Sequence, residues 1–316
     1  MSRIPRAFLW SRVHSLMGVW LVLFLFVHLL TNSQAALFVG DDGKGFIYDV
    51  ELIHSLPYLK AIELFFLAIP FAVHMIWGVK YLFTGKSNAL PNGGEHPYIS
   101  HGGNWRYTLQ RATAWLLLIG VLAHVVQMRF VNYPTSYEIG SQHFYLTKLS
   151  FDRGLYSLAA RLGVLIKTSD EVNSLPPPPL PTQSLSQLID TDQATQRAIL
   201  DSQRQEEQIR AYEVIKAESV GEGECLAVCP NFGTATLLMV RDTFKSIWMA
   251  MLYTIFVVAT CFHAFNGLWT AAITWGVTLS PASQRSLLRG AVALMCFVGF
   301  LGCAAIWGTY WINLRY

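Results

Sequence analysis

The sequence contains 316 residues, of which 53% are hydrophobic and only 14% are charged. Charged residues make up about a quarter of an ordinary soluble protein, so this composition argues against a soluble enzyme and indicates a protein of the lipid bilayer. The net charge of +3 is small and is not gathered into one basic face, which argues against nucleic acid and leaves membrane lipid, lipid-soluble molecules or other proteins as partners. The five cysteines have the spacing of neither a disulfide framework nor a zinc site.

Five stretches are long and apolar enough to cross a bilayer as helices. A spanning helix needs about 20 mostly apolar residues to cover a hydrocarbon core of about 30 Å. The stretches are 13–30, 58–83, 108–131, 244–278 and 287–312. The sequence therefore predicts an all-α membrane protein in which five transmembrane helices form a bundle.

The basic residues of the short connections predict the orientation of these spans, because Lys and Arg are retained on the cytoplasmic side. They gather before the first span, between the second and third, and between the fourth and fifth, at Arg3, Arg6, Arg12, Lys80, Lys86, Arg106, Arg111, Arg285 and Arg289. The connection between the first and second spans is acidic instead. We therefore expect a multi-pass protein of the cytoplasmic (inner) membrane, with its N-terminus in the cytoplasm.

The predicted spans divide the chain into three parts: 1–132 with spans one to three, an external insertion at 133–242, and 243–316 with spans four and five. A connection of this length is a small domain or partly disordered. The insertion is expected to be partly helical, with an amphipathic or buried helix in the apolar stretch 154–166, a stiff proline-rich linker at 176–179 and a polar helix over 183–217. Cys225 and Cys229 follow, and their spacing leaves a metal or disulfide role as a minor alternative.

Four histidines lie inside four different apolar spans: His28, His74, His124 and His263. An ionisable side chain within a span is costly and marks a candidate site. Any one of them alone is explained as well by a hydrogen bond to a neighbouring helix.

The depths of the four histidines arrange them as two pairs. His28 lies about 16 residues past Arg12, or roughly 24 Å from the cytoplasmic end of the first span, and His124 lies at a similar height in the third. His74 and His263, on spans that run the other way, both fall in the inner half. Two pairs on alternate helices are what two stacked bis-histidine haems require, so the bundle is predicted to bind two haem b groups, with His28 and His124 as ligands of one haem iron and His74 and His263 as ligands of the other. A zinc site or a proton relay is the alternative use of these imidazoles.

Other polar residues fit this arrangement. At 100° per residue, Glu63 shares the face of His74 but lies roughly 16 Å nearer the outside, where it could exchange protons with a quinone or simply contact headgroup water. His14 lies on the stripe of His28 at the cytoplasmic end. Gln110 and Arg111 begin the third span, where the guanidinium could pair with a haem propionate or serve as a cytoplasmic anchor.

At these residues the chain resembles the cytochrome b membrane-anchor subunit of succinate dehydrogenase and fumarate reductase, in its single-subunit, five-helix, two-haem form. The resemblance covers all five spans and departs from the family pattern in the insertion. It is carried by Arg12-Val13-His14-Ser15-Leu16-Met17-Gly18 with His28, by Glu63 to His74 and Gly78, by Asn104-Trp105 and Thr108-Leu109-Gln110-Arg111 with His124, and above all by His263-Ala264-Phe265-Asn266-Gly267-Leu268-Trp269, Thr274-Trp275-Gly276 and Ser280-Pro281 to Gln284-Arg285.

The resemblance implies a complex in which a flavoprotein subunit oxidises succinate, an iron-sulfur subunit passes the electrons on, and this subunit delivers them through its haems to a quinone, commonly menaquinone. It implies that His74 and His263 hold the inner haem, facing the iron-sulfur subunit on the cytoplasmic side, and that His28 and His124 hold the outer one. His14, Ser15, Gln110 and Arg111 are the propionate or quinone candidates, and Glu63 is the candidate for proton handling. The succinate site itself would lie on a partner subunit.

Two other classes compete with this interpretation. One is the di-haem cytochrome b subunit of another quinone-linked complex, such as a hydrogenase or a formate dehydrogenase. In the cytochrome b of quinol:cytochrome c complexes, two helices supply two histidines each, and four ligands on four helices argue against that member of the class. The other is a haem-free scaffold or transporter, which would require the matched depths to be chance.

Overall fold

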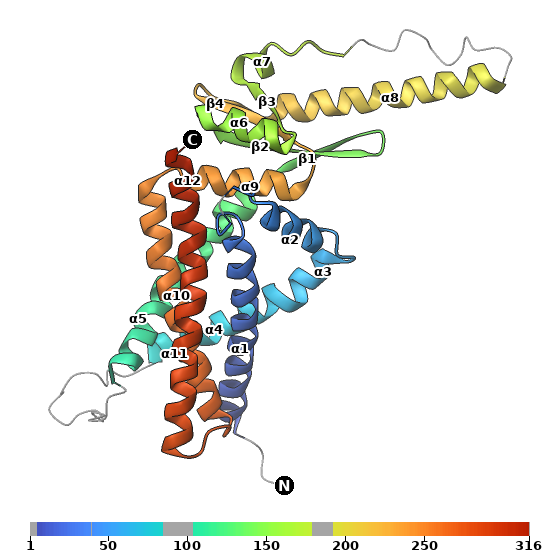
Figure 1. Cartoon of the computed structure of the whole chain (residues 1–316). Helices are drawn as coiled ribbons and strands as arrows, with labels where there is room; N and C mark the ends of the chain where they lie inside the picture. The colour runs from blue at the N-terminus through green and yellow to red at the C-terminus, as the bar shows by residue number, and fades with distance from the viewer. Residues whose placement is uncertain (1–4, 39, 85–103, 179–191, 316) are drawn as a thin grey trace.

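The computed structural model describes residues 5–38, 40–84, 104–178 and 192–315. Arg3, Lys86, the last proline of the predicted linker and the first part of the predicted polar helix lie outside the described residues. Within them, five helices are long and apolar enough to cross a membrane, which confirms the predicted bundle (Figure 1). They are Arg6–Ser33, Leu59–Thr84, Trp105–Val131, Ile247–Thr274 and Pro281–Arg315.

Some of these spans are built from more than one helical segment, because π-helical turns interrupt the α-helix. In chain order the segments are α1 (Arg6–Ser33); α3 (Leu59–Glu63), η1 (Leu64–Ala68) and α4 (Ile69–Thr84); α5 (Asn104–Val125) and η2 (Val126–Val131); α10 (Ile247–Thr274); and α11 (Pro281–Cys303), η4 (Ala304–Gly308) and α12 (Thr309–Arg315). A π-turn holds one more residue than an α-turn and leaves backbone groups in need of partners. At η1 the Trp20 indole, on α1, donates to the Phe66 carbonyl at 2.5 Å.

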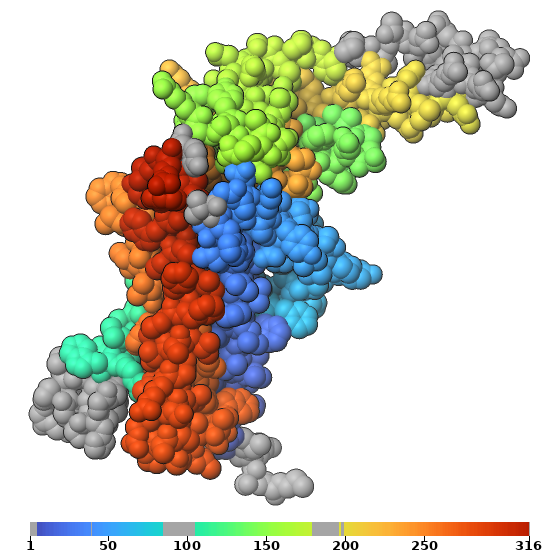
Figure 2. Space-filling model, viewed as in Figure 1, coloured from blue at the N-terminus to red at the C-terminus, as the bar shows by residue number. Residues whose placement is uncertain are grey.

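The helix α10 is the centre of the bundle, since it packs against α1, α5 and α11, whereas α4 packs chiefly against α1. The fifth span begins sharply at Pro281, where the Ser280 hydroxyl caps the helix by accepting from the Ser283 backbone N–H at 3.1 Å. The bundle has two ends. We call the one that carries residues 133–242 the insertion end and the opposite one, where α1 begins, the far end (Figure 2).

The insertion contains a four-stranded sheet, a feature that the sequence analysis missed. Its strand order is β1-β2-β4-β3 and every neighbouring pair is antiparallel. The segments of the insertion, with the connecting helix of the first loop, are α2 (Lys44–His54), β1 (Thr135–Ile139), β2 (Gln142–Ser150), α6 (Arg153–Leu162), β3 (Leu165–Thr168), α7 (Ser169–Asn173), α8 (Asp192–Ala217), β4 (Glu224–Cys229) and α9 (Phe232–Thr243).

Two helix predictions in the insertion meet different outcomes. The expected polar helix is confirmed over α8, which extends away from the sheet (Figure 1). The expected helix at 154–166 is corrected: it ends at Leu162, where Gly163 takes a left-handed conformation with φ of 67°, and the apolar residues that follow form β3. A short apolar run fits a strand as well as a helix, which is why the pattern alone misplaced this boundary.

Cys225 and Cys229 are free thiols at the two ends of β4. Both side chains lie in a buried cluster with Leu149 and Leu155, where burial raises the pKa of Cys225 to about 11 and that of Cys229 to about 12. The two thiols are not joined in a disulfide, and both pack in the core between the sheet and its helices.

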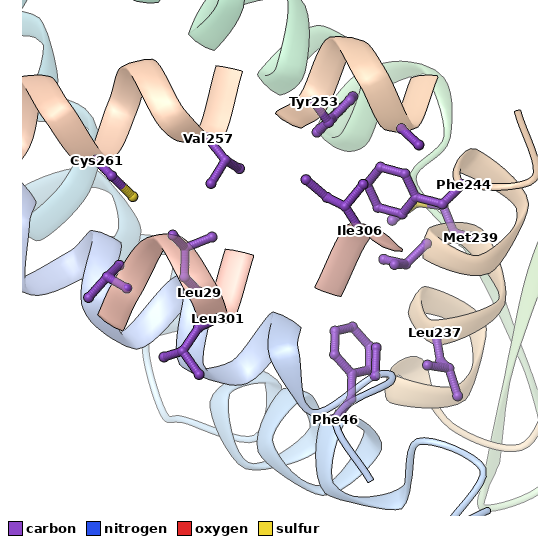
Figure 3. Packing of buried hydrophobic residues seen from close by; sticks show 14 of the residues in the cluster. Leu29, Phe46, Leu237, Met239, Phe244, Tyr253, Val257, Cys261, Leu301 and Ile306 are labelled. Atoms are coloured by element: carbon purple, nitrogen blue, oxygen red, sulfur yellow. The ribbon is translucent and has the colours of Figure 1, made fainter. Parts of the chain in front are cut away.

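The insertion is joined to the bundle by one continuous hydrophobic core. Helix α9 lies across the insertion end, and Leu237, Met239 and Phe244 pack with Phe46 of α2 and Ile306 of η4 (Figure 3). At Gly233 an added Cβ would lie 2.6 Å from the Ile47 carbonyl oxygen, so only glycine allows α9 to approach α2 this closely. The insertion is therefore part of the same folded unit as the spans.

An ionic cluster reinforces this junction. The Asp152 carboxylate caps α6 and accepts both guanidinium N–H groups of Arg241, at 2.9 and 3.0 Å, with the Lys245 ammonium 2.7 Å away. Burial alone would raise the pKa of Asp152, but the hydrogen bonds from Arg241 and Lys245 outweigh it and hold this pKa well below its usual range.

We expect Asp152→Asn to lower the free energy of unfolding of the insertion by about 1 to 2 kcal/mol at pH 7. The neutral amide has a single acceptor oxygen and cannot replace the charged carboxylate that binds both Arg241 and Lys245. A depressed folded pKa contributes stability above the unfolded value near pH 4, and that stability is lost as the pH falls through the folded value. Hydrogen exchange of β2 and α6 should thus show a difference between variant and wild type that shrinks below about pH 4. Asp201→Asn, in an exposed pair on α8, is the control, and an equal effect from both variants would contradict this role.

Candidate functional site

The four histidines of the spans meet in two facing pairs inside the bundle. The rings of His28 on α1 and His124 on α5 have centroids 6.0 Å apart, with 78° between their planes. The rings of His74 on α4 and His263 on α10 have centroids 6.3 Å apart, with 85° between their planes. The structure thus brings together the same partners that the depth argument paired.

The pairs lie at two levels along α1. His28 belongs to the pair nearer the insertion end, while His14 stacks on His74 with ring centroids 4.1 Å apart. His14 and His28 are about four turns apart on one helix, so the two pairs are separated by roughly 20 Å along the bundle.

Hydrogen bonds at Nδ1 fix the orientation of three of these rings. His74 Nδ1 lies 3.1 Å from the His14 carbonyl oxygen, and His263 Nδ1 lies 3.2 Å from the Gln110 carbonyl oxygen. His124 Nδ1 lies 3.2 Å from the Tyr253 hydroxyl. A carbonyl only accepts, so Nδ1 carries the proton in the first two and Nε2 is left as the metal-binding atom.

The spacing of the rings matches that of two imidazoles on one iron. With metal–nitrogen bonds of about 2 Å on opposite sides of the metal, the ring centroids stand roughly 6 Å apart. All four histidines are half-buried, so neighbouring side chains do not enclose them completely. Among the residues that the structure describes, no three His, Cys, Asp or Glu side chains form a metal site, and the donor set on offer is therefore two imidazole pairs.

The surroundings of the His74–His263 pair contain polar atoms without partners. His14 Nδ1 and Ser15 Oγ are buried and have no hydrogen-bond partner within the protein. Gly18, one turn further along α1, has no side chain, and a Cβ there would stand 2.9 Å from His74 Cε1. The unpaired atoms of His14 and Ser15 lie near the His74 ring, and Gly18 leaves room for that ring. Such surroundings fit a bound group that carries acceptor oxygens.

Gln110 and Arg111 lie on the other side of this pair. The Gln110 amide donates to the His263 carbonyl at 3.1 Å and accepts from the Asn266 amide at 2.8 Å, so it links α5 to α10 beside His263. The Arg111 guanidinium lies 3.5 Å from the Leu82 carbonyl, near the far end of α4. Gln110 therefore holds His263 in place through protein contacts.

Glu63 contacts the third span. Its carboxylate lies 2.9 Å from the Arg129 guanidinium of η2, and both side chains are about 40% exposed. The π-turn η1 lies between Glu63 and His74 and holds an extra residue, so a uniform 100° per residue does not describe the rotation between them.

Several residues around the pairs were missed by the sequence analysis. They are Gly18, Gln127, Arg129, Tyr253 and, as a hydrogen-bond partner, Asn266. A tyrosine or glutamine in an apolar span has no spacing rule that links it to a histidine on another helix, so only the packing of the helices reveals these contacts.

The fold and the histidine pairs together define a class of protein: a five-helix membrane protein whose bundle holds two facing histidine pairs at two depths. The chain is 25% identical over 302 residues to the succinate dehydrogenase cytochrome b558 subunit of Bacillus subtilis (strain 168), an alignment that covers 95% of this chain and 96% of that protein. No protein-family model and no solved structure matches the chain. The resemblance to the cytochrome b membrane subunit of succinate dehydrogenase is thereby confirmed.

We expect Gly18→Ala to reduce haem occupancy at the His74–His263 site and to leave the His28–His124 site filled, because the new methyl group displaces the His74 ring. Reduced-minus-oxidised spectra combined with a pyridine haemochrome assay measure both. Gly290→Ala in α11, where a Cβ meets nothing within 4 Å, is the matched control. Full occupancy of both sites in Gly18→Ala would show that this glycine does not position the ligand.

Proposed function

We propose that this chain is the membrane anchor and di-haem electron-transfer subunit of a succinate:quinone oxidoreductase. The observation that carries the proposal is the pair of bis-histidine sites, with ring centroids 6.0 and 6.3 Å apart, at two levels of one bundle. The similarity to a succinate dehydrogenase cytochrome b558 subunit supports the choice of complex. No comparable support exists for the hydrogenase or formate dehydrogenase alternative.

Each of the two proposed haem groups would be held by one of the histidine pairs. His74 and His263 would hold the group of the inner site and His28 and His124 that of the outer one, and the Nδ1 contacts of His74, His124 and His263 leave Nε2 as the nitrogen available to a metal. Haem b, when bound, supplies a one-electron carrier at each site. His14 Nδ1 and Ser15 Oγ are the buried polar groups that could donate to a propionate at the inner site, and Arg111, in the first turns of the third span, is the proposed cationic partner.

The far end of the bundle is proposed to face the cytoplasm. Arg6, Lys80, Arg285 and Arg289 are exposed there, in agreement with the retention of basic residues on the cytoplasmic side. A flavoprotein subunit, which holds the succinate site, and an iron-sulfur subunit would dock at this end, next to the inner site. The insertion would then stand on the outside of the cytoplasmic membrane.

A quinone, with menaquinone as the proposed species, would react near the outer site. Glu63 lies toward the insertion end of span two, where a carboxylate can hold a proton for the quinone oxygens, and Arg129 at 2.9 Å keeps it oriented. On this arrangement electrons move from the cytoplasmic side toward the outside, which would couple succinate oxidation to the membrane potential.

The purified chain should contain two haem b groups by pyridine haemochrome assay. His28→Ala and His74→Ala should each lose one group, and the two variants should lose different components of the reduced-minus-oxidised spectrum, because each removes a ligand from a different pair. A well-folded wild type without haem would overturn both the ligand assignment and the function.

Glu63→Gln should slow quinone reduction by the assembled complex by roughly tenfold to a hundredfold, because the amide keeps the shape and the contact with Arg129 but cannot hold the proton. Haem content should not change. Glu213→Gln, on the exposed face of α8, provides the control. An unchanged rate of quinone reduction in Glu63→Gln would remove this residue from the proton path.

A further inference from the structure

The two histidine pairs differ in what accepts the Nδ1 hydrogen of their ligands. At the His74–His263 pair the nearest acceptors are backbone carbonyls, of His14 at 3.1 Å and Gln110 at 3.2 Å, and the Thr113 hydroxyl lies further from His263 Nδ1, at 3.4 Å. At the His28–His124 pair the partner of His124 is the hydroxyl of Tyr253, on α10. A backbone carbonyl is the same in any sequence, whereas a phenol is a specific side chain with a proton of its own.

The hydroxyl of Tyr253 is one link of a directed chain. It donates to the Gln127 Oε1 atom at 3.0 Å, so its oxygen lone pair faces His124 Nδ1 at 3.2 Å. The order of donation is therefore from His124 to Tyr253 and from Tyr253 to Gln127. Hydrogen bonds in such a chain polarise one another, and the phenol becomes a better acceptor because it also donates.

The surroundings leave Tyr253 little freedom to break this chain. Its side chain is buried, and its ring packs against Phe244 at 5.2 Å and Phe256 at 6.1 Å between centroids. Phe244 follows α9, the helix that joins the insertion to the bundle. The ring is thus held from both sides, and its hydroxyl stays aimed at His124 and Gln127.

We propose that Tyr253, supported by Gln127, is the positioning residue of the outer site and sets its reduction potential separately from that of the inner site. The inference rests on the proposed function, since it requires His124 to bind iron. An acceptor on Nδ1–H makes the imidazole more basic, and a more basic ligand favours the oxidised metal. The hydrogen bonds from His124 to Tyr253 and from Tyr253 to Gln127 therefore lower the potential of the outer site.

The test is a redox titration of both haems in the purified full-length chain. Tyr253→Phe keeps the ring and removes the acceptor, so the ratio of reduced to oxidised outer haem at fixed potential should rise by up to about tenfold, an upward shift of about 59 mV for one electron. The inner haem is the internal control and should not move. Tyr310→Phe, in α12, is the matched control variant and should shift neither haem.

A double-mutant cycle separates the hydrogen-bond chain from a general disturbance of packing. Gln127→Leu should raise the outer potential by less than Tyr253→Phe does, and its effect should disappear in the Tyr253→Phe background, because the chain is already broken there. Purely additive effects, or equal shifts of both haems, would overturn the proposal. If Tyr253→Phe loses the outer haem, Gln127→Leu becomes the deciding variant. An unchanged potential of the outer haem in Gln127→Leu would then overturn the proposal.

The proposed function and the role of Tyr253 can fail separately. A wild type without haem would overturn the proposed function and this inference with it. A wild type with two haems, of which the outer one ignores both Tyr253→Phe and Gln127→Leu, would overturn the inference and leave the proposed function standing.

Discussion

The structure depends on how imidazole rings are held inside a low-dielectric bundle. A ring nitrogen without a hydrogen-bond partner is costly in hydrocarbon, and His74, His124 and His263 each have a hydrogen bond at Nδ1. That bond also selects the tautomer that leaves Nε2 for a metal. One interaction therefore satisfies the membrane and prepares the site, and the helices that supply its acceptors, α1, α5 and α10, form the centre of the bundle.

Much of this arrangement could be predicted from the sequence because helical rise converts residue number directly into depth. The spacing of His28 and His124 from the cytoplasmic ends of their spans sufficed to pair them. The ion pair of Glu63 with Arg129 could not be predicted in the same way, since the π-turn η1 adds a residue that a uniform 100° period ignores and the partner lies on another span. Tyr253 could not be predicted either, because its role depends on which helix α10 packs against.

The sheet of the insertion escaped prediction for a different reason. Strand β4 has six residues, of which the last five are apolar, and β3 has four, of which the first two are apolar; apolar runs this short fit strands and helices alike. Strand β4 pairs with β2, and the paired residues are about 80 positions apart in sequence, so no local pattern indicates the contact. The same packing places α9 over the insertion end, so Phe244 reaches the ring of Tyr253 and the insertion contributes to the rigidity of the outer site.

Electron paramagnetic resonance of the oxidised purified chain tests the central claim most directly. Two bis-histidine sites with ring planes 78° and 85° apart predict two separate low-spin ferric signals. Both should be strongly anisotropic, because perpendicular imidazoles leave two iron d orbitals close in energy. A single signal, or a high-spin signal from iron with one histidine ligand in the intact protein, would contradict the paired-ligand account.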